Sequence, residues 1–347
     1  MDDRIREAVG EAPAWVVGGA LRDELLGREV VDRDVTCPSP EAAARRYARL
    51  AGGAVFRLSE RHGAWRVAFR DGKTVDFTPV HGESIEEDLA TRDFTVNALA
   101  RPLAGGPLVD PFGGEADLEA RRLRAVGPAV FEDDPLRLLR AVRLEDELGF
   151  RLDEPTEQLV RAGAGRVGDP AGERILGELE RFSPDGFRRA AELALLEPLG
   201  GSAAGLGRVD PDNAPGFLLV VVFGERLGRF PISNDLRKLA SILLAAERPA
   251  NSSAREIHRF RRRTEPWALS ALAYLGATDL DEEVLAARAA DHPEPLLRGD
   301  DVLALGLEPG PEVGRLLDLV AEERAVGTIS TREEALDLVR RELRPER

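Results

Sequence analysis

The chain of 347 residues contains one cysteine, Cys37, and no hydrophobic run long enough to cross a membrane. A single cysteine cannot form an internal disulfide, and without Cys or His partners at ligand spacing it offers no zinc site. A membrane helix needs about 18 or more apolar residues, and the N-terminus lacks the pattern of a secretion signal. We therefore expect a cytoplasmic protein in which Cys37 is a small buried residue.

Aromatic residues are scarce, at 5%, and acidic residues outnumber basic ones, which gives a net charge of −15. The 43% of hydrophobic residues is typical of a globular protein with an aliphatic, helix-rich core. The negative charge argues against nonspecific nucleic-acid binding, because phosphate contacts need basic side chains. Nearly all the basic residues are arginines, which suit phosphate and base-edge contacts on a locally basic surface. A nucleic-acid function must therefore rest on local motifs.

The pattern of hydrophobic residues divides the chain into an α/β part and a helical part. Strands are predicted at AWVVGG, DRDVTC, AVFRLS, AWRVAFR and KTVDFTP, with helices beginning at Leu21 and Glu41. From about Asp117 the apolar residues follow helical spacing, broken by Pro and Gly. We predict an α/β head over residues 1–125, a helical neck over 126–200, and a helical body and tail over 201–347.

Three carboxylates occur in two of the predicted strands. Asp32 and Asp34 are two residues apart, so both lie on one face of their strand. Asp76, between two apolar residues, would complete a cluster if its strand lies beside them. Carboxylate oxygens suit Mg²⁺, and two such ions can hold the attacking and leaving oxygens in phosphoryl transfer. A pair of this kind is also common on solvated surfaces.

A glycine-rich corner precedes these carboxylates. The predicted strand ends at Gly18 and Gly19 and opens a helix that contains Arg22. Glycines at such a corner let backbone N–H groups approach a phosphate, and Arg22 would add a fixed positive charge. An ordinary strand-turn-helix corner with a surface arginine has the same sequence pattern.

A later predicted helix carries charged residues at a spacing of three. They are Asp134, Arg137, Arg140 and Arg143. At this spacing they lie along one side of a helix, where a carboxylate and a guanidinium can face one base edge. Such a pair fits cytosine and adenine, whose edges place an amino donor beside a ring acceptor, and rejects uracil and guanine. The alternative is a solvated basic stripe.

Together these residues carry a family resemblance. The segments GGALRDELLG and DRD are followed in order by DLATRDFTVNALA, DPFGGEADLEARRLRAVG, EDDPLRLLRAVRLEDELGF and GERILGELER. This series, over residues 14–182, resembles class II tRNA nucleotidyltransferases and bacterial poly(A) polymerases of the DNA polymerase β superfamily. The segment GDDVLALGLEPGPEVGRLL near the C-terminus is similar to the tail of bacterial CCA-adding enzymes.

The resemblance implies a template-independent, Mg²⁺-dependent enzyme that adds C and/or A to the 3′ end of tRNA from CTP and ATP. It also implies that the body and tail, residues 201–347, bind the tRNA. It implies that Asp32 and Asp34 bind the metals and that Asp76 is the third acidic residue. The remaining residues would bind the nucleotide: Gly18, Gly19 and Arg22 at the triphosphate, Arg92, Asp93 and Asn97 near the ribose and phosphates, and Asp134, Arg137, Arg140 and Arg143 at the base and phosphates. Thr91 stands where the family usually has an arginine.

One departure from the family leaves the product open. Many CCA-adding relatives have a long flexible loop, associated with the switch from CTP to ATP, where this chain has a short segment between Asp76 and Arg92. A CC-adding enzyme that lacks terminal A addition is therefore an alternative to full CCA addition. A poly(A) polymerase shares the head motifs, although the tail disfavours it, and a catalytically silent RNA- or nucleotide-binding protein is the alternative from another class.

The densest basic run is the cluster His258–Arg263, whose sequence is HRFRRR. Interleaved with an aromatic residue, it predicts either a grip on an RNA backbone or the solvated face of a helix. Protein partners and the oligomeric state do not follow from the sequence.

Overall fold

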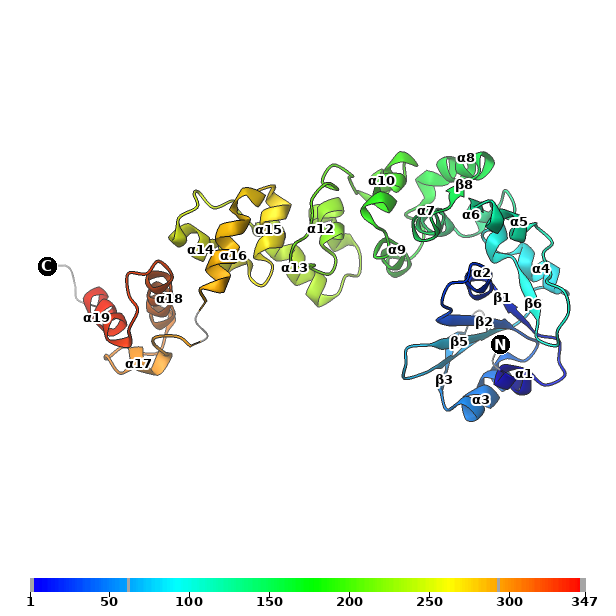
Figure 1. Cartoon of the computed structure of the whole chain (residues 1–347), viewed down its shortest axis with the longest axis horizontal. Coiled ribbons are helices and arrows are strands. Elements are labelled where there is room, and N and C mark those ends of the chain that lie inside the picture. Colours follow the sequence, from blue (N-terminus) through cyan, green and yellow to red (C-terminus); the bar gives the residue numbers. More distant parts are fainter. Residues whose placement is uncertain (1–2, 61–62, 292–293, 344–347) are drawn as a thin grey trace. The chain divides into compact units, whose positions relative to one another are not determined.

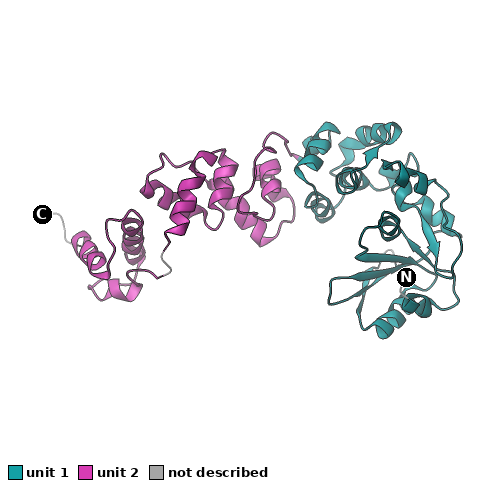
Figure 2. Cartoon of the chain, viewed as in Figure 1, with its two compact units in different colours: residues 1–199 teal, residues 200–347 magenta. Residues whose placement is uncertain are grey.

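The computed structural model describes residues 3–60, 63–291 and 294–343, and Figure 1 labels the helices and strands. The chain forms two compact units, Met1–Leu199 and Gly200–Arg347, which Figure 2 colours separately. An α/β part is followed by a helical part, which confirms the predicted fold class. Among the described residues, no helix is long and apolar enough to cross a membrane.

A mixed sheet of six strands forms the head. The strands are β1 (Trp15–Val17), β2 (Asp32–Thr36), β3 (Ala54–Ser59), β4 (Ala64–Ala68), β5 (Thr74–Thr78) and β6 (Ala100–Pro102). Their order across the sheet is β3-β4-β5-β2-β1-β6. Strands β2 and β5 run parallel, and the other neighbours are antiparallel. Strand β2, with the predicted catalytic pair, therefore lies inside the sheet between β5 and β1.

One face of this sheet is buried beneath helices. Alternate residues of β4 and β5, among them Val67 and Phe77, are fully buried. Helix α3 (Pro40–Ala51) packs on β3, β4 and β5, and α1 (Asp3–Val9) packs on α3, so both lie on the same side of the sheet (Figure 1). The Tyr47 ring lies 5.8 Å from that of Phe77. The residues that alternate with these buried ones, among them the carboxylates, point to the other face of the sheet.

The remainder of the first unit is mainly helical. Its helices are α2 (Gly19–Leu25), α4 (Ile85–Ala90), η1 (Thr95–Asn97), α5 (Gly114–Glu119), α6 (Val130–Asp133), α7 (Arg137–Leu148), α8 (Glu154–Gly163), η2 (Ala164–Arg166), α9 (Gly172–Leu179), α10 (Pro184–Glu192) and α11 (Leu196–Leu199). A parallel pair, β7 (Arg122–Leu123) and β8 (Arg151–Leu152), departs from the all-helical expectation. Gly149 ends α7 in a left-handed conformation and turns the chain back, and two-residue strands are too short to show periodicity.

The second unit is entirely helical in its described part. Its elements are α12 (Phe217–Phe223), η3 (Gly224–Arg229), α13 (Asn234–Ala245), α14 (Ala254–Thr264), α15 (Ala268–Leu275), η4 (Thr278–Leu280), α16 (Asp281–Ala289), α17 (Gly299–Leu303), α18 (Pro311–Ala325) and α19 (Arg332–Glu342). Side chains of Ser233, Ser253 and Thr331 accept backbone hydrogen bonds and begin three of these helices. The last three helices share a small core that includes Val302, Leu316 and Val339.

The basic cluster 258–263 lies on α14, and acidic side chains from elsewhere in the second unit meet its arginines. Arg259 Nε lies 2.8 Å from Glu322 of α18, and Arg262 pairs with Asp318 of the same helix. Both terminal nitrogens of Arg261 donate to the carboxylate of Asp291, which lies just after α16. These acids lie at least 28 residues further along the chain, so the local sequence could not reveal them. An RNA-binding role for the cluster stays a prediction.

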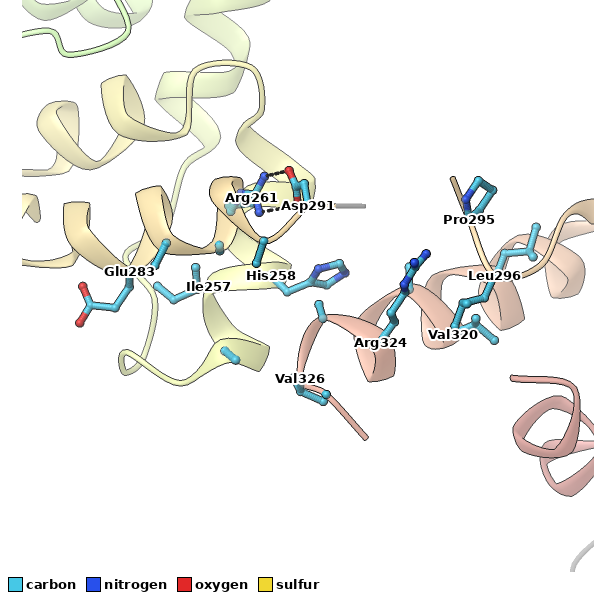
Figure 3. Close-up of a pocket in the computed structure, with 18 of the residues that line it drawn as sticks. Ile257, His258, Arg261, Glu283, Asp291, Pro295, Leu296, Val320, Arg324 and Val326 are labelled. Carbon is cyan, nitrogen blue, oxygen red and sulfur yellow. Dashed lines mark hydrogen bonds and ion pairs between the residues drawn. The ribbon is translucent and has the colours of Figure 1, made fainter. Parts of the chain in front are cut away.

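A cavity of about 690 Å³ lies beside α14, with α16 and α18 also contributing to its walls (Figure 3). Much of the lining is apolar, as at Ile257 and Val320. Among its polar groups, Arg261 is paired with Asp291, and burial lowers the pKa of His258. None of the lining residues belongs to the motifs of the first unit.

Candidate active site

The three predicted carboxylates lie together on the uncovered face of the sheet. In the parallel pairing of β2 with β5, Asp34 is the direct partner of Asp76, and Asp32 is the partner of Thr74. Asp32 and Asp34 share a face because they are two residues apart. The Thr74 hydroxyl donates to Asp32 at 2.7 Å. The sheet thus brings the predicted DxD pair and the third acidic residue to one place.

Burial and neighbouring charges act together on the carboxylates of this face. Burial raises the pKa of Asp34, and the nearby carboxylates of Asp76 and Asp32 raise it further, while the guanidinium of Arg92 acts in the opposite direction. A divalent cation would offset this repulsion, and the donors are the oxygens that such a cation prefers. Asp32 and Asp34 therefore fit as a metal-binding pair. No group of three or more acidic, His or Cys side chains in the described parts of the chain is arranged as a complete metal site.

Arg66 explains why the third carboxylate does not complete such a group. From β4, its Nε and Nη2 atoms donate to the two carboxylate oxygens of Asp76, each at 2.7 Å. Sequence reasoning missed Arg66, although a signal existed. A hairpin turn at Asp71-Gly72 sets a register between β4 and β5 in which Arg66 faces Asp76.

The glycine corner lies against this cluster. Gly18 has a φ of +72°, and a Cβ atom there would lie 2.9 Å from Arg92 Nη1 and 3.2 Å from Asp34 Oδ2. A larger residue would therefore displace two side chains of the site. Helix α2 begins at Gly19, and the buried Arg22 on its first turn donates to the Asn97 side chain at 2.7 Å.

A buried polar network extends from Arg22 toward α7. Asn97 donates to Asp93 at 2.9 Å, and Arg140 Nε donates to the other carboxylate oxygen of Asp93 at 2.9 Å. Although burial alone would raise the pKa of Asp93, the ion pair with Arg140 and the hydrogen bonds from Asn97 and the Phe94 backbone lower it to about 2. Four of the predicted nucleotide-binding residues are thus linked in one chain of contacts.

The expected stripe along α7 needs a correction. Asp134 lies before the helix, in an extended conformation, because α7 begins only at Arg137. Its carboxylate accepts from the Leu136 backbone at 3.1 Å and from Arg174 at 2.7 Å. Pro135 accounts for the break, since it disfavours helix in the residue before it.

The arginines of α7 differ in how accessible they are. Arg137 Nη2 donates to the backbone carbonyl of Thr91 at 2.6 Å, in an exposed contact. Arg143 is buried, and its Nε donates to Glu178 at 2.6 Å while Nη1 pairs with Glu147. Arg137 therefore lies near the surface, whereas Arg143 lies in the interior of the neck.

The segment between β5 and α4 is short and firmly held. Asp88 of α4, only 1% exposed, accepts from the His81 backbone at 3.0 Å, from His81 Nδ1 at 2.9 Å and from Arg92 at 3.1 Å. Gly82 has a φ of +85°, and a Cβ atom there would overlap the Glu87 side chain. Residues 79–84 therefore form a fixed turn whose anchor also holds Arg92.

A mixed sheet with acidic residues on its open face, beside a glycine corner, defines the head as a nucleotidyltransferase. The family model described as "Poly A polymerase head domain" matches residues 14–84 and 61–124. The A-adding tRNA nucleotidyltransferase of Deinococcus radiodurans is 34% identical over 94% of this chain and 95% of its own. The CC-adding tRNA nucleotidyltransferase of Geobacter sulfurreducens is 31% identical over 93% of this chain and 90% of its own.

The fold agrees with these relatives. The Bacillus stearothermophilus CCA-adding enzyme in complex with CTP superimposes with a TM-score of 0.74, at 27% identity, over 99% of this chain and 98% of the other. The chain belongs to the class II tRNA nucleotidyltransferases, because its likeness to curated members spans nearly its whole length. It is therefore an enzyme of nucleotidyl transfer, and a divalent metal is general to that class.

Proposed function

We propose that this enzyme adds cytidylate to the 3′ end of tRNA, stops before the terminal adenylate, and uses CTP with Mg²⁺. Whole-length relatives include both A-adding and CC-adding enzymes, so the similarity supports either of two partial reactions. A cytoplasmic location, expected from the sequence, remains part of this proposal.

The fixed turn at residues 79–84 is the observation that carries the CC-adding function. A change from CTP to ATP requires the base-reading side chains to move, and the family associates that change with a long flexible loop at this point. Here the loop is replaced by a turn tied through His81 to the buried Asp88. A turn held by two hydrogen bonds to one buried carboxylate has little freedom to change its conformation.

The proposed chemistry is in-line attack of the RNA 3′-hydroxyl on the α-phosphate of CTP. Asp32 and Asp34 would hold Mg²⁺, which when bound neutralises developing charge on the reacting phosphate. Gly18, Gly19 and Arg22 would hold the triphosphate, with Arg92 next to Asp34 as a further positive charge. The contribution of these residues is positioning and charge neutralisation.

Base selection is assigned to Asp134 and Arg137. An Asp carboxylate can accept from the N4 amino group of cytosine, and an Arg can donate to N3. Each side chain has one partner in an exposed contact that an incoming base can replace, namely Arg174 for Asp134 and the Thr91 carbonyl for Arg137. Arg140, held by Asp93, would support this edge from beneath.

The product can be measured directly. A tRNA transcript that ends before CCA is incubated with CTP and ATP together, and its mass is determined. Addition of two cytidylates and nothing more is the expected result, and a product ending in CCA would contradict it. A transcript ending in CC tests the second candidate, since an A-adding enzyme, as the Deinococcus radiodurans relative is named, would extend only this one.

A further inference from the structure

The row of residues that crosses the sheet at the catalytic carboxylates continues beyond them. Asp34 on β2 is the partner of Asp76 on β5, Asp76 is the partner of Arg66 on β4, and Arg66 is the partner of Phe56 on β3. Directly paired residues place their side chains on the same face of a sheet. Phe56 therefore lies on the catalytic face, one strand outward from Arg66.

Phe56 is a large apolar side chain that is 46% exposed. Strand β3 lies at the edge of the sheet, and residues on its opposite face contact β4. Val67, the partner of Val55, is fully buried on that opposite face, and Arg57 lies over the Trp65 ring at 5.7 Å. The strand therefore presents an aromatic ring on the side where the reaction takes place.

The geometry of in-line attack determines the direction from which the acceptor RNA approaches the carboxylates. The attacking hydroxyl must approach from the side of the α-phosphate opposite to the departing pyrophosphate. The triphosphate is assigned to the corner between β1 and α2, and β1 flanks β2 on one side. The acceptor RNA must therefore reach the carboxylates from the other side of β2, over β5, β4 and β3.

We propose that Phe56 is a stacking platform for the base of the terminal nucleotide of the acceptor RNA, an inference that rests on the proposed function. Two strand spacings, about 10 Å, separate β3 from β5, so the platform is within reach of an RNA end whose hydroxyl lies at Asp76. Between them, the Arg66 guanidinium offers positive charge beside three carboxylates that would repel RNA phosphates.

Stacking also suits a reaction whose acceptor RNA has a different terminal base after each addition. The terminal base of the RNA changes each time a nucleotide is added, and before the first addition it differs among tRNAs. An aromatic ring holds any of these bases, because every base has a π-face and stacking does not read hydrogen-bond donors and acceptors.

The decisive comparison uses Phe56→Ala, Phe56→Tyr and the control Leu50→Ala, which removes an exposed apolar side chain from α3, on the covered side of the sheet. Phe56→Ala should lower kcat/KM for tRNA roughly tenfold, the effect of losing one stacked base, with KM for CTP unchanged. Phe56→Tyr and Leu50→Ala should match the parent enzyme. Equal kcat/KM for tRNA in Phe56→Ala and the parent would refute the platform.

A second acceptor separates stacking from a structural effect. An RNA with an abasic terminal nucleotide should react about tenfold more slowly than normal RNA with the parent enzyme, and equally slowly with Phe56→Ala. If Phe56→Ala slows the abasic acceptor by a further tenfold, the side chain acts through the fold and the proposal fails.

Binding without turnover keeps this inference distinct from the proposed function. A tRNA with 2-aminopurine at its 3′ end loses fluorescence when that base stacks. Quenching by the parent enzyme and not by Phe56→Ala supports the platform even if the added nucleotide proves not to be C. Equal quenching by both proteins overturns the platform even if CC addition is confirmed.

Discussion

Two groups of charged residues, one in each unit, differ in how their charges are arranged. In the first unit, Asp32, Asp34 and Asp76 gather on one face of the sheet, and the pKa of Asp34 rises because burial and like charges act together. In the second unit, Arg262 and Asp318 form an exposed pair. Like charges gathered in one place indicate a site, whereas an exposed charge paired with its opposite contributes mainly to solubility and packing.

The largest effect is expected when one of the gathered carboxylates is removed. Asp32→Ala and Asp34→Ala should each lower incorporation of labelled CTP by about a thousandfold or more, because each deletes a metal-binding carboxylate. The melting temperature should not fall, since no core volume is lost and repulsion decreases. Asp235→Ala, at the start of α13, is the matched acidic control. Near-normal incorporation by either variant would remove the metal assignment.

The second test concerns the ion pair of Asp93 and Arg140 in the first unit, in which Asp93 is buried and Arg140 is about a third exposed. Asp93→Asn should lower the free energy of unfolding by about 1–3 kcal/mol, because it weakens a charge-assisted hydrogen bond to a buried carboxylate while Arg140 keeps Glu178 as a second partner. Chemical denaturation of the full chain measures this value. A loss below about 1 kcal/mol would mean that this ion pair behaves like an exposed one, and the contrast between the units would lose its energetic basis.

The same pair predicts a dependence on pH. The pKa of Asp93 falls from its ordinary value of 3.8 to about 2 in the folded chain. The folded state therefore binds a proton less readily, and the stabilisation is complete above pH 3.8 and lost as the pH falls toward 2. The difference in unfolding free energy between the parent and Asp93→Asn should shrink over this interval and stay constant above it.

A smaller effect is expected for base choice. Arg137→Ala removes the proposed donor to cytosine N3, so discrimination against UTP should fall roughly tenfold, as for one lost hydrogen bond to a charged group. Transfer itself should persist at a reduced rate. Competition between labelled CTP and UTP gives the ratio, with Arg166→Ala, an exposed arginine that contacts the backbone of Glu132, as a control for loss of a nearby positive charge. Selectivity equal to that of the parent would refute the role of Arg137.

The smallest effect is expected in the second unit. Asp318→Asn breaks a pair whose side chains are 61% and 57% exposed, so unfolding free energy should change by no more than about 1 kcal/mol. The same denaturation experiment that measures Asp93→Asn checks this value. A loss as large as that of Asp93→Asn would show that surface pairing holds α14 and α18 together, and the two units would no longer differ in kind.

Much of the head could be predicted because strands and motifs leave local signals. Alternation placed Asp32 and Asp34 on one face, and the apolar neighbours of Asp76 placed its side chain on the side of its strand away from them. The order of strands leaves no such signal, so the adjacency of β5 and β2, and hence the row that includes Arg66 and Phe56, came only from the structure.

The neck and second unit were harder to predict for two physical reasons. A spacing of three implied one helical stripe from Asp134 to Arg143, but Pro135 delays the start of α7, and packing commits Arg143 to Glu178. Arg259, Arg261 and Arg262 of α14 each have a partner 30 or more residues further along the chain, in contacts that local sequence does not encode. The tRNA-binding role expected for residues 201–347 therefore remains a proposal.

The alternation in β4 makes the catalytic face inseparable from the core. Trp65 and Val67 point inward and Arg66 points outward, so a slip of one residue in the pairing of β4 with β5 would expose the first two and bury the third. Such a misregistered chain would lose its hydrophobic packing together with its contact to Asp76. Molecules with an incorrectly assembled active face should thus be unstable and open to proteolysis, so that folding itself selects against inactive enzyme.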